Sequence, residues 1–151
     1  MMGSEKKDDF DKFVESLQAE VDAQDRKDFS EYALSLGKKP YKCEEMPEDI
    51  RSVEHKYRGP CGDAIKLFLN IEDDKITDIN FVADGCTTSI IAASQMVKMV
   101  EGKSIEKAKQ LSQEDVLEAL GKFPKESHHC AKLAVDTLTQ TLDKYKNKRN
   151  S

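Results

Sequence analysis

Three of the four cysteines stand where the predicted secondary structure changes, and such positions can present a side chain for chemistry. Cys61 lies in the turn-forming sequence of residues 59–63. Cys86 follows directly after a glycine at a predicted helix start, and Cys130 lies in the first turn of the last predicted helix. The three are 25 and 44 residues apart, so no local zinc-binding spacing links them. Any site that they share must be assembled by the fold.

The chemistry open to these cysteines is the binding of metal or sulfur by thiolate. Amide groups at a helix start carry partial positive charge, so we expect the thiolate form to be favoured at Cys86 and Cys130. Four tetrahedral ligands suit zinc, or one iron of a cluster, and Asp63 can be the fourth. Its hard oxygen holds iron sulfide less firmly than a thiolate, which predicts a labile site. His129 is an alternative ligand, or an acid or base near neutral pH.

The same residues also have plainer interpretations. For a single cysteine a buried or bystander role is ordinary, and we expect it for Cys43, which has no motif partner. Asp63 could instead cap its own turn, and His129 could support the ligands without binding metal. His55 is expected to be a strand residue, and His128 to be exposed.

The middle of the chain alternates apolar and polar residues with the period of a half-buried strand. This alternation covers residues 53–57, 65–71 and 76–83. Residues 72–75, with the sequence Glu-Asp-Asp-Lys, form a turn signal between the last two segments. The pattern predicts an antiparallel meander whose second and third strands form a hairpin.

Helical periodicity replaces this alternation after Gly85 and ends at Gly102. Ser104 and Ser112 are typical caps of two short helices, the second of which is expected to end at Gly121. A last helix is predicted from about residue 127 to 148. Strands followed by helices indicate an α+β fold, with helices on one face of a small three-stranded antiparallel sheet and a long C-terminal helix.

The N-terminal part of the chain is acidic and helical in pattern. Residues 7–21 have apolar side chains at helical spacing, and a second short helix is predicted over residues 28–36, with Gly37 at its end. We expect residues 1–151 to form a single domain, with the acidic helical segment at about residues 5–36. The Phe and Leu stripe of the first helix is expected to join the core or to form a self-association surface, which would make a homo-oligomer.

Composition excludes several classes of function. The 151 residues include 24 Lys and Arg and 29 Asp and Glu, and the formal charge of −5 argues against a general affinity for nucleic acid or anionic lipid. No apolar run approaches the roughly 20 residues that cross a membrane, and the charged first residues do not fit a signal peptide. We therefore expect a cytoplasmic protein, whose cysteines are metal ligands or free thiols rather than disulfides.

The motifs around the cysteines closely resemble those of the NifU/IscU family of iron-sulfur scaffolds. In order along the chain they are Pro60-Cys61-Gly62-Asp63, Asp84-Gly85-Cys86, Ala92-Ala93-Ser94, Gly102-Lys103-Ser104, His129-Cys130 and Leu133-Ala134. The match extends from about Tyr57 to Tyr145. One departure is Thr87, which stands where family members commonly have a second glycine.

This resemblance implies a function and assigns roles. It implies a carrier rather than an enzyme with catalytic residues: a scaffold that receives sulfur as persulfide from a cysteine desulfurase and delivers clusters to apo-proteins such as ferredoxins. It also implies an iron-sulfur cluster, for which we favour [2Fe-2S], held by Cys61, Asp63, Cys86 and Cys130. His129 is the family's extra candidate ligand, and Zn²⁺ is an alternative occupant in the purified protein.

Two other functions compete with this interpretation. A zinc-dependent sulfurtransferase of the related SufU type would pass sulfur through its cysteines while zinc stays bound. Those relatives carry an insertion between the second and third cysteines and an Arg before the last. This chain has compact spacing and His129, so the scaffold is favoured. A redox thiol protein would be expected to use a Cys-x-x-Cys pair, which the sequence lacks.

Overall fold

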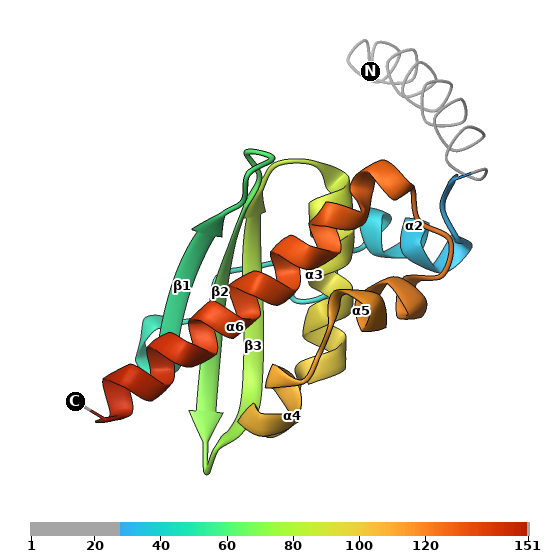
Figure 1. The fold of residues 1–151 in the computed structure, drawn as a ribbon. Helices are drawn as coiled ribbons and strands as arrows, with labels where there is room; N and C mark the ends of the chain where they lie inside the picture. The colour runs from blue at the N-terminus through green and yellow to red at the C-terminus, as the bar shows by residue number, and fades with distance from the viewer. Residues whose placement is uncertain (1–27, 151) are drawn as a thin grey trace, which may run out of the picture.

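The sheet at the centre of the protein is three-stranded and antiparallel, with its strands in sequence order. A computed structural model describes residues 28–150, and Figure 1 shows their arrangement. The strands are β1 (Val53–Arg58), β2 (Ala64–Glu72) and β3 (Lys75–Asp84). Asp73 and Asp74 connect β2 to β3 with positive φ angles of 52° and 60°, the conformation that tight hairpin turns need. The predicted meander and hairpin are confirmed.

One helix precedes the sheet and four follow it within residues 28–150, in the order that the sequence predicts. They are α2 (Glu31–Lys38), α3 (Thr87–Val100), α4 (Ile105–Lys109), α5 (Gln113–Leu120) and α6 (His128–Asn150), with short 3₁₀ turns η1 (Glu48–Ile50) and η2 (Lys125–Ser127). Ser104 and Ser112 cap α4 and α5 by accepting hydrogen bonds from backbone N–H groups, and Gly121 ends α5. These three predictions are therefore confirmed.

The main core lies between one face of the sheet and the helices α3 and α6. Ile65, Leu67 and Leu69 alternate toward this side of β2, and their partners on β3 include Phe81 and Ile79. On α6 the fully buried Leu138 packs in the same cluster. Burial of apolar side chains on this scale provides the main driving force for folding. The layered arrangement agrees with the predicted α+β class, with helices on one face and a long C-terminal helix (Figure 1).

The other face of the sheet is partly covered by the segment that leads into β1. Phe68 on that face is fully buried, and Arg51 stacks over its ring at 4.5 Å. Lys42 accepts a backbone hydrogen bond from Phe81, so the segment also pairs briefly with the free edge of β3. The alternating pattern of β2 predicted a polar second face, so it did not predict that the segment before β1 covers this face. Phe68 is the residue of β2 that departs from that pattern.

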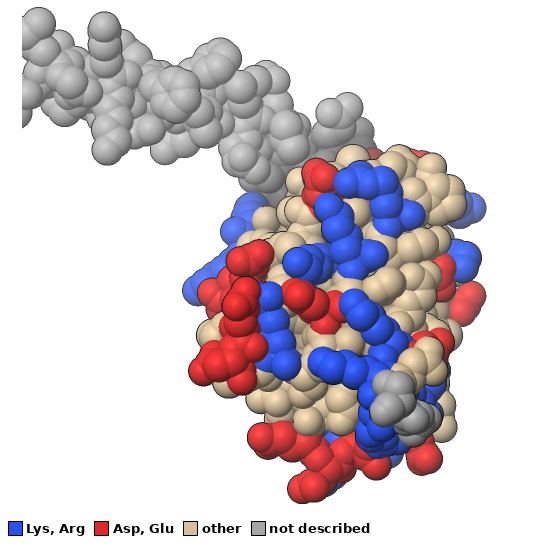
Figure 2. Space-filling view, turned by 90° about the vertical axis from the view of Figure 1, so that its left-hand side faces the viewer, with Lys and Arg blue, Asp and Glu red and all other residues tan. Residues whose placement is uncertain are grey.

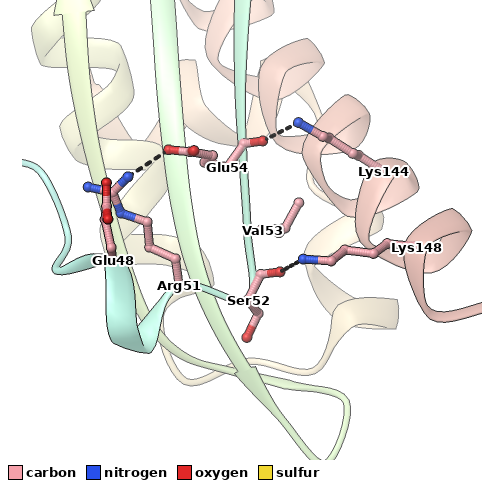
Figure 3. Close-up of a pocket in the computed structure, with 7 residues that line it drawn as sticks. All are labelled: Glu48, Arg51, Ser52, Val53, Glu54, Lys144 and Lys148. Carbon is pink, nitrogen blue, oxygen red and sulfur yellow. Dashed lines mark hydrogen bonds and ion pairs between the residues drawn. The ribbon is translucent and has the colours of Figure 1, made fainter.

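Helix α6 also closes the free edge of β1. Lys144 Nζ donates to the carbonyl oxygen of Glu54 at 2.7 Å, and Lys148 Nζ donates to that of Ser52 at 3.3 Å (Figure 3). These contacts line a pocket of about 350 Å³. Figure 2 shows basic and acidic side chains interspersed on this side of the molecule. Because edge carbonyls invite pairing with other strands, the lysines protect the edge.

The structure shifts the bounds of one of the two predicted N-terminal helices and does not describe the other. Helix α2 begins three residues later and ends two residues later than predicted, and it continues through Gly37 to Lys38. A Cβ atom at position 37 would lie 3.2 Å from the side chain of Ile91, so the glycine lets α2 approach α3 closely. The helix predicted over residues 7–21 lies outside the described residues. Within residues 28–150, no helix combines the length and the apolar character needed to span a membrane.

Candidate metal and cluster site

Three connections that carry the motif residues meet at one end of the sheet. They are the β1–β2 turn, the β3–α3 connection and the start of α6, which lie together at the top of Figure 1. The antiparallel register pairs Arg58 with Ala64 and Ala64 with Asp84, which brings the first two connections side by side. We call this region the cysteine end.

Asp63 caps helix α3 from a distant part of the sequence. Its Oδ2 accepts hydrogen bonds from the Cys86 N–H at 3.2 Å and from Ser89 Oγ at 2.6 Å. Cys86 occupies the N-cap position and makes no side-chain cap bond itself. The carboxylate instead satisfies the N–H of this N-cap residue, one of the backbone donors left free at a helix start. The Ser89 hydroxyl lowers the pKa of Asp63 most, with further lowering by the Cys86 amide and His129, against the opposing effect of burial.

Gly85 leaves the space in which this carboxylate sits. A Cβ atom built at position 85 would overlap the carboxyl carbon and Oδ1 of Asp63, and φ is 154° there. The invasion of a packed space by a methyl group costs typically about 1–3 kcal/mol. The glycine of the Gly85-Cys86 motif therefore has a steric role.

We expect Gly85→Ala to displace Asp63 from α3 and to lower the free energy of unfolding by about 1–3 kcal/mol, because the new methyl group occupies the position of the carboxylate. Denaturant titration of the metal-free protein measures this change. Gly62→Ala is the matched control, since residue 62 also has a positive φ, of 95°, but nothing lies within 4 Å of the added Cβ. Equal destabilisation by the two variants would contradict the steric explanation.

Cys130 differs from the sequence-based expectation. It lies in the first turn of α6 as predicted, but only 1% of it is exposed. Burial raises the pKa of its thiol, although hydrogen bonds with Ser89 and Thr88 act in the opposite direction. The expectation that a helix start makes Cys130 an exposed and readily ionised thiol is therefore wrong, because desolvation outweighs the helix terminus here.

Cys61 and Cys86 are exposed, as their positions predicted. Cys61 lines an open pocket of about 490 Å³, which is also lined by Tyr57, Leu133 and His129. Thr87 is the first residue of α3, so the position where relatives commonly have a glycine is helical here and needs no special backbone freedom.

The three histidines occupy different settings. His129 Nε2 lies 3.7 Å from Cys130 Sγ, at the cysteine end. His128 Nε2 contacts the carbonyl oxygen of Phe123 at 3.1 Å, so it is half-buried rather than simply exposed. His55 is a strand residue that contacts Gln140, as expected. Only His129 of these three lies beside a candidate ligand.

The described part of the chain contains no preformed metal cage. No group of three or more His, Cys, Asp or Glu side chains in residues 28–150 is arranged to hold an ion. The donor types gathered at the cysteine end are nevertheless three thiols, one carboxylate and one imidazole, which suit zinc and iron. All four cysteines are free thiols, and Cys43 lies away from this end, in an isolated bridge to Phe81.

Sequence reasoning missed the residue at the centre of these contacts. Ser89 is fully buried, and its Oγ lies 2.6 Å from Asp63 Oδ2 and 3.4 Å from Cys130 Sγ. Thr88 Oγ1 lies 3.3 Å from the same sulfur. The signal that could have found them is the run of three hydroxyl residues, Thr-Thr-Ser, directly after Cys86.

We expect Asp63→Ala to lower the free energy of unfolding of the metal-free protein by about 1 kcal/mol at neutral pH, because α3 loses its cap. The folded-state pKa of Asp63 is depressed, so this stability is present above the ordinary value of 3.8 and is lost as the pH falls through the folded-state pKa. Denaturant titrations of both proteins across the acid range, with chelator present, measure the difference. A difference that stays constant to the lowest pH would contradict this assignment.

Comparison with protein families identifies the chain. A family model described as the NifU-like N terminal domain matches residues 28–151. The chain belongs to the NifU-like N-terminal domain family. This membership confirms the resemblance read from the cysteine motifs.

Curated relatives in sequence carry related names. An iron-sulfur cluster assembly scaffold protein IscU of Archaeoglobus fulgidus is 38% identical over 98 residues, which are 65% of this chain and 64% of that protein. The chain thus spans a little under two thirds of that relative's length. The IscU scaffold protein of Rickettsia prowazekii is 30% identical over 128 residues, which cover 78% of this chain and 97% of the relative.

Solved structures share the fold of this NifU-like domain. A crystal structure described as a scaffold protein of the SUF system from Fervidobacterium islandicum superposes with a TM-score of 0.63 at 20% identity, and the match covers 76% of this chain and 96% of that one. A NifU-like N-terminal structure from Brucella abortus gives a TM-score of 0.62 at 15% identity, with coverage of 79% and 94%. At these identities the likeness shows the fold alone.

Proposed function

We propose that this NifU-like protein is a scaffold on which iron-sulfur clusters are assembled and from which they are passed to apo-proteins. The cluster is then a substrate that the protein binds and releases. Family membership and the names of the sequence relatives support this proposal. The structure adds the gathering of thiol, carboxylate and imidazole groups at the cysteine end.

The observation that carries the proposal is the shared position of Asp63 and Cys130. Ser89 bridges the carboxylate and the sulfur, although their residues are 67 positions apart in sequence. We propose Cys61, Cys86 and Cys130 as thiolate ligands, Asp63 as the labile oxygen ligand and His129 as its replacement.

The partners follow from the chemistry of cluster assembly. Sulfur for the cluster is proposed to arrive as a persulfide from a cysteine desulfurase, and an external electron donor supplies the electrons that reduce it to sulfide. The accepting proteins are proposed to be apo-ferredoxins and similar proteins. Cys61 and Cys86 are exposed and can meet a partner protein directly. We propose [2Fe-2S] as the cluster, which its Mössbauer spectrum distinguishes from [4Fe-4S].

Anaerobic reconstitution with ferrous iron, cysteine, a desulfurase and a thiol reductant, which supplies electrons to reduce persulfide sulfur to sulfide, tests the function. The account predicts a visible absorption band and a Mössbauer spectrum of a [2Fe-2S] cluster, followed by transfer of the cluster to apo-ferredoxin. The variant in which Cys61, Cys86 and Cys130 are all serine is the control and should form no cluster. Persulfide on the cysteines with tightly held zinc and no cluster would instead indicate the SufU-type sulfurtransferase and would contradict the scaffold.

A further inference from the structure

Ser89 has one hydroxyl proton and two acceptors within reach. Asp63 Oδ2 at 2.6 Å and Cys130 Sγ at 3.4 Å both lie within hydrogen-bonding distance of its Oγ. A hydroxyl group can donate to one of them at a time. The short bond to the charged carboxylate is the stronger, so the Ser89 hydroxyl donates its hydrogen bond to Asp63 in the metal-free protein.

The binding of metal changes which group is available to accept the hydrogen bond from the Ser89 hydroxyl. If Asp63 leaves α3 to bind metal, the carboxylate no longer faces Ser89. At the same time the buried Cys130 thiol would release its proton to solvent and become a metal-bound thiolate. Thr88 is its other hydroxyl neighbour, at 3.3 Å. A buried sulfur anion gains from a donated hydrogen bond. The released hydroxyl of Ser89 is already in place to supply it.

We propose that Ser89 is a positioning residue that holds Asp63 on the N-terminus of α3 in the metal-free protein and turns to the Cys130 sulfur when metal takes Asp63. This inference rests on the proposed function, because it takes Asp63 and Cys130 as ligands. It adds Ser89 as a residue that links two events. When the Asp63 carboxylate leaves α3, the Ser89 hydroxyl becomes free to donate a hydrogen bond to the Cys130 thiolate.

The test is a double-mutant cycle in the full chain, with Zn²⁺ alone as the probe. In the Asp63→Ala background, Ser89→Ala should weaken zinc binding about tenfold, equivalent to about 1.4 kcal/mol, because only the bond to the thiolate is lost. With Asp63 present, the same change should alter affinity less than about threefold, because the hydroxyl is lost from both states. Competition with a chromophoric chelator measures these constants.

Ser94→Ala is the matched control. Ser94 is a fully buried serine of the same helix, and its Oγ accepts a bond from the Tyr41 N–H, away from the cysteine end. It should change zinc affinity equally in both backgrounds. Equal fold-changes for Ser89→Ala in the two backgrounds would overturn the coupling. Circular dichroism melts verify that each variant is folded at the temperature of the titration.

Hydrogen exchange of the Cys86 amide, whose N–H donates to Asp63 Oδ2, provides a second readout that follows the movement of Asp63 itself. In the metal-free state this amide should be about tenfold better protected in the wild type than in Asp63→Ala, equivalent to about 1.4 kcal/mol. On zinc loading the two proteins should become alike, because Asp63 has left the helix. Protection that stays higher in the loaded wild type would overturn the inference. Failure of the wild type to bind zinc through its cysteines would instead overturn the proposed function.

Discussion

Replacement of any one of Cys61, Cys86 and Cys130 by serine is expected to weaken zinc binding by at least about a hundredfold, equivalent to about 2.8 kcal/mol. The reason is that a serine hydroxyl does not ionise near neutral pH and is a poor ligand for a soft metal. Elemental analysis of the purified variants and competition with a chelator measure the loss. The wild type should hold about one divalent metal per chain.

Cys43→Ser is the control for this series. Cys43 is an exposed free thiol like Cys61, but it lies in a bridge to Phe81 and not at the cysteine end. Its replacement should leave zinc affinity within about twofold of the wild type, as for surface changes distant from a site. Unchanged metal content in all three site variants would remove the proposed ligand set.

Asp63→Ala is expected to lengthen the lifetime of the bound cluster and to slow its transfer to apo-ferredoxin, each by roughly tenfold, equivalent to about 1.4 kcal/mol. The His129 imidazole then takes the place of an oxygen ligand that exchanges easily, so assembly continues while release slows. The measurement loads both proteins equally and follows the decay of the visible band with and without acceptor.

Asp84→Ala is the matched control for loss of a negative charge at this end of the domain. Asp84 is exposed and pairs with Arg58 at 3.1 Å, and within residues 28–150 its side chain makes no hydrogen bond to a cysteine. Its replacement should leave both rates unchanged. Since Asp63 also caps α3, a loss of stability is expected either way. Only unaltered lifetimes and transfer rates per cluster would show that capping is its whole role.

Much of the fold could be predicted, because its signals are local. The alternation in β2 and β3, the aspartate turn between them and the serine caps of α4 and α5 each depend on a few neighbouring residues. The cover over Phe68 could not be predicted in this way. The cover depends on the segment before β1, which lies on the other face of the sheet. The periodicity of β2 contains no information about that contact.

The candidate site was predicted in its residues but not in its arrangement. Motif settings pointed to Asp63 and the three cysteines, yet two physical effects decided their state. Asp63 meets the start of α3 across 23 residues of sequence and becomes its cap. Cys130 is desolvated by the packing of α6, which outweighs the helix terminus. Both effects arise from tertiary contacts, as does the bridging position of Ser89.

Zinc K-edge X-ray absorption of the stoichiometrically loaded wild type tests the central claim most directly, because it counts the atoms bound to the metal. The account predicts three sulfur ligands at about 2.3 Å and one oxygen or nitrogen ligand at about 2.0–2.2 Å. One sulfur should be lost in each of Cys61→Ser, Cys86→Ser and Cys130→Ser. A wild-type spectrum with one sulfur ligand or none would contradict a shared site built from these three cysteines.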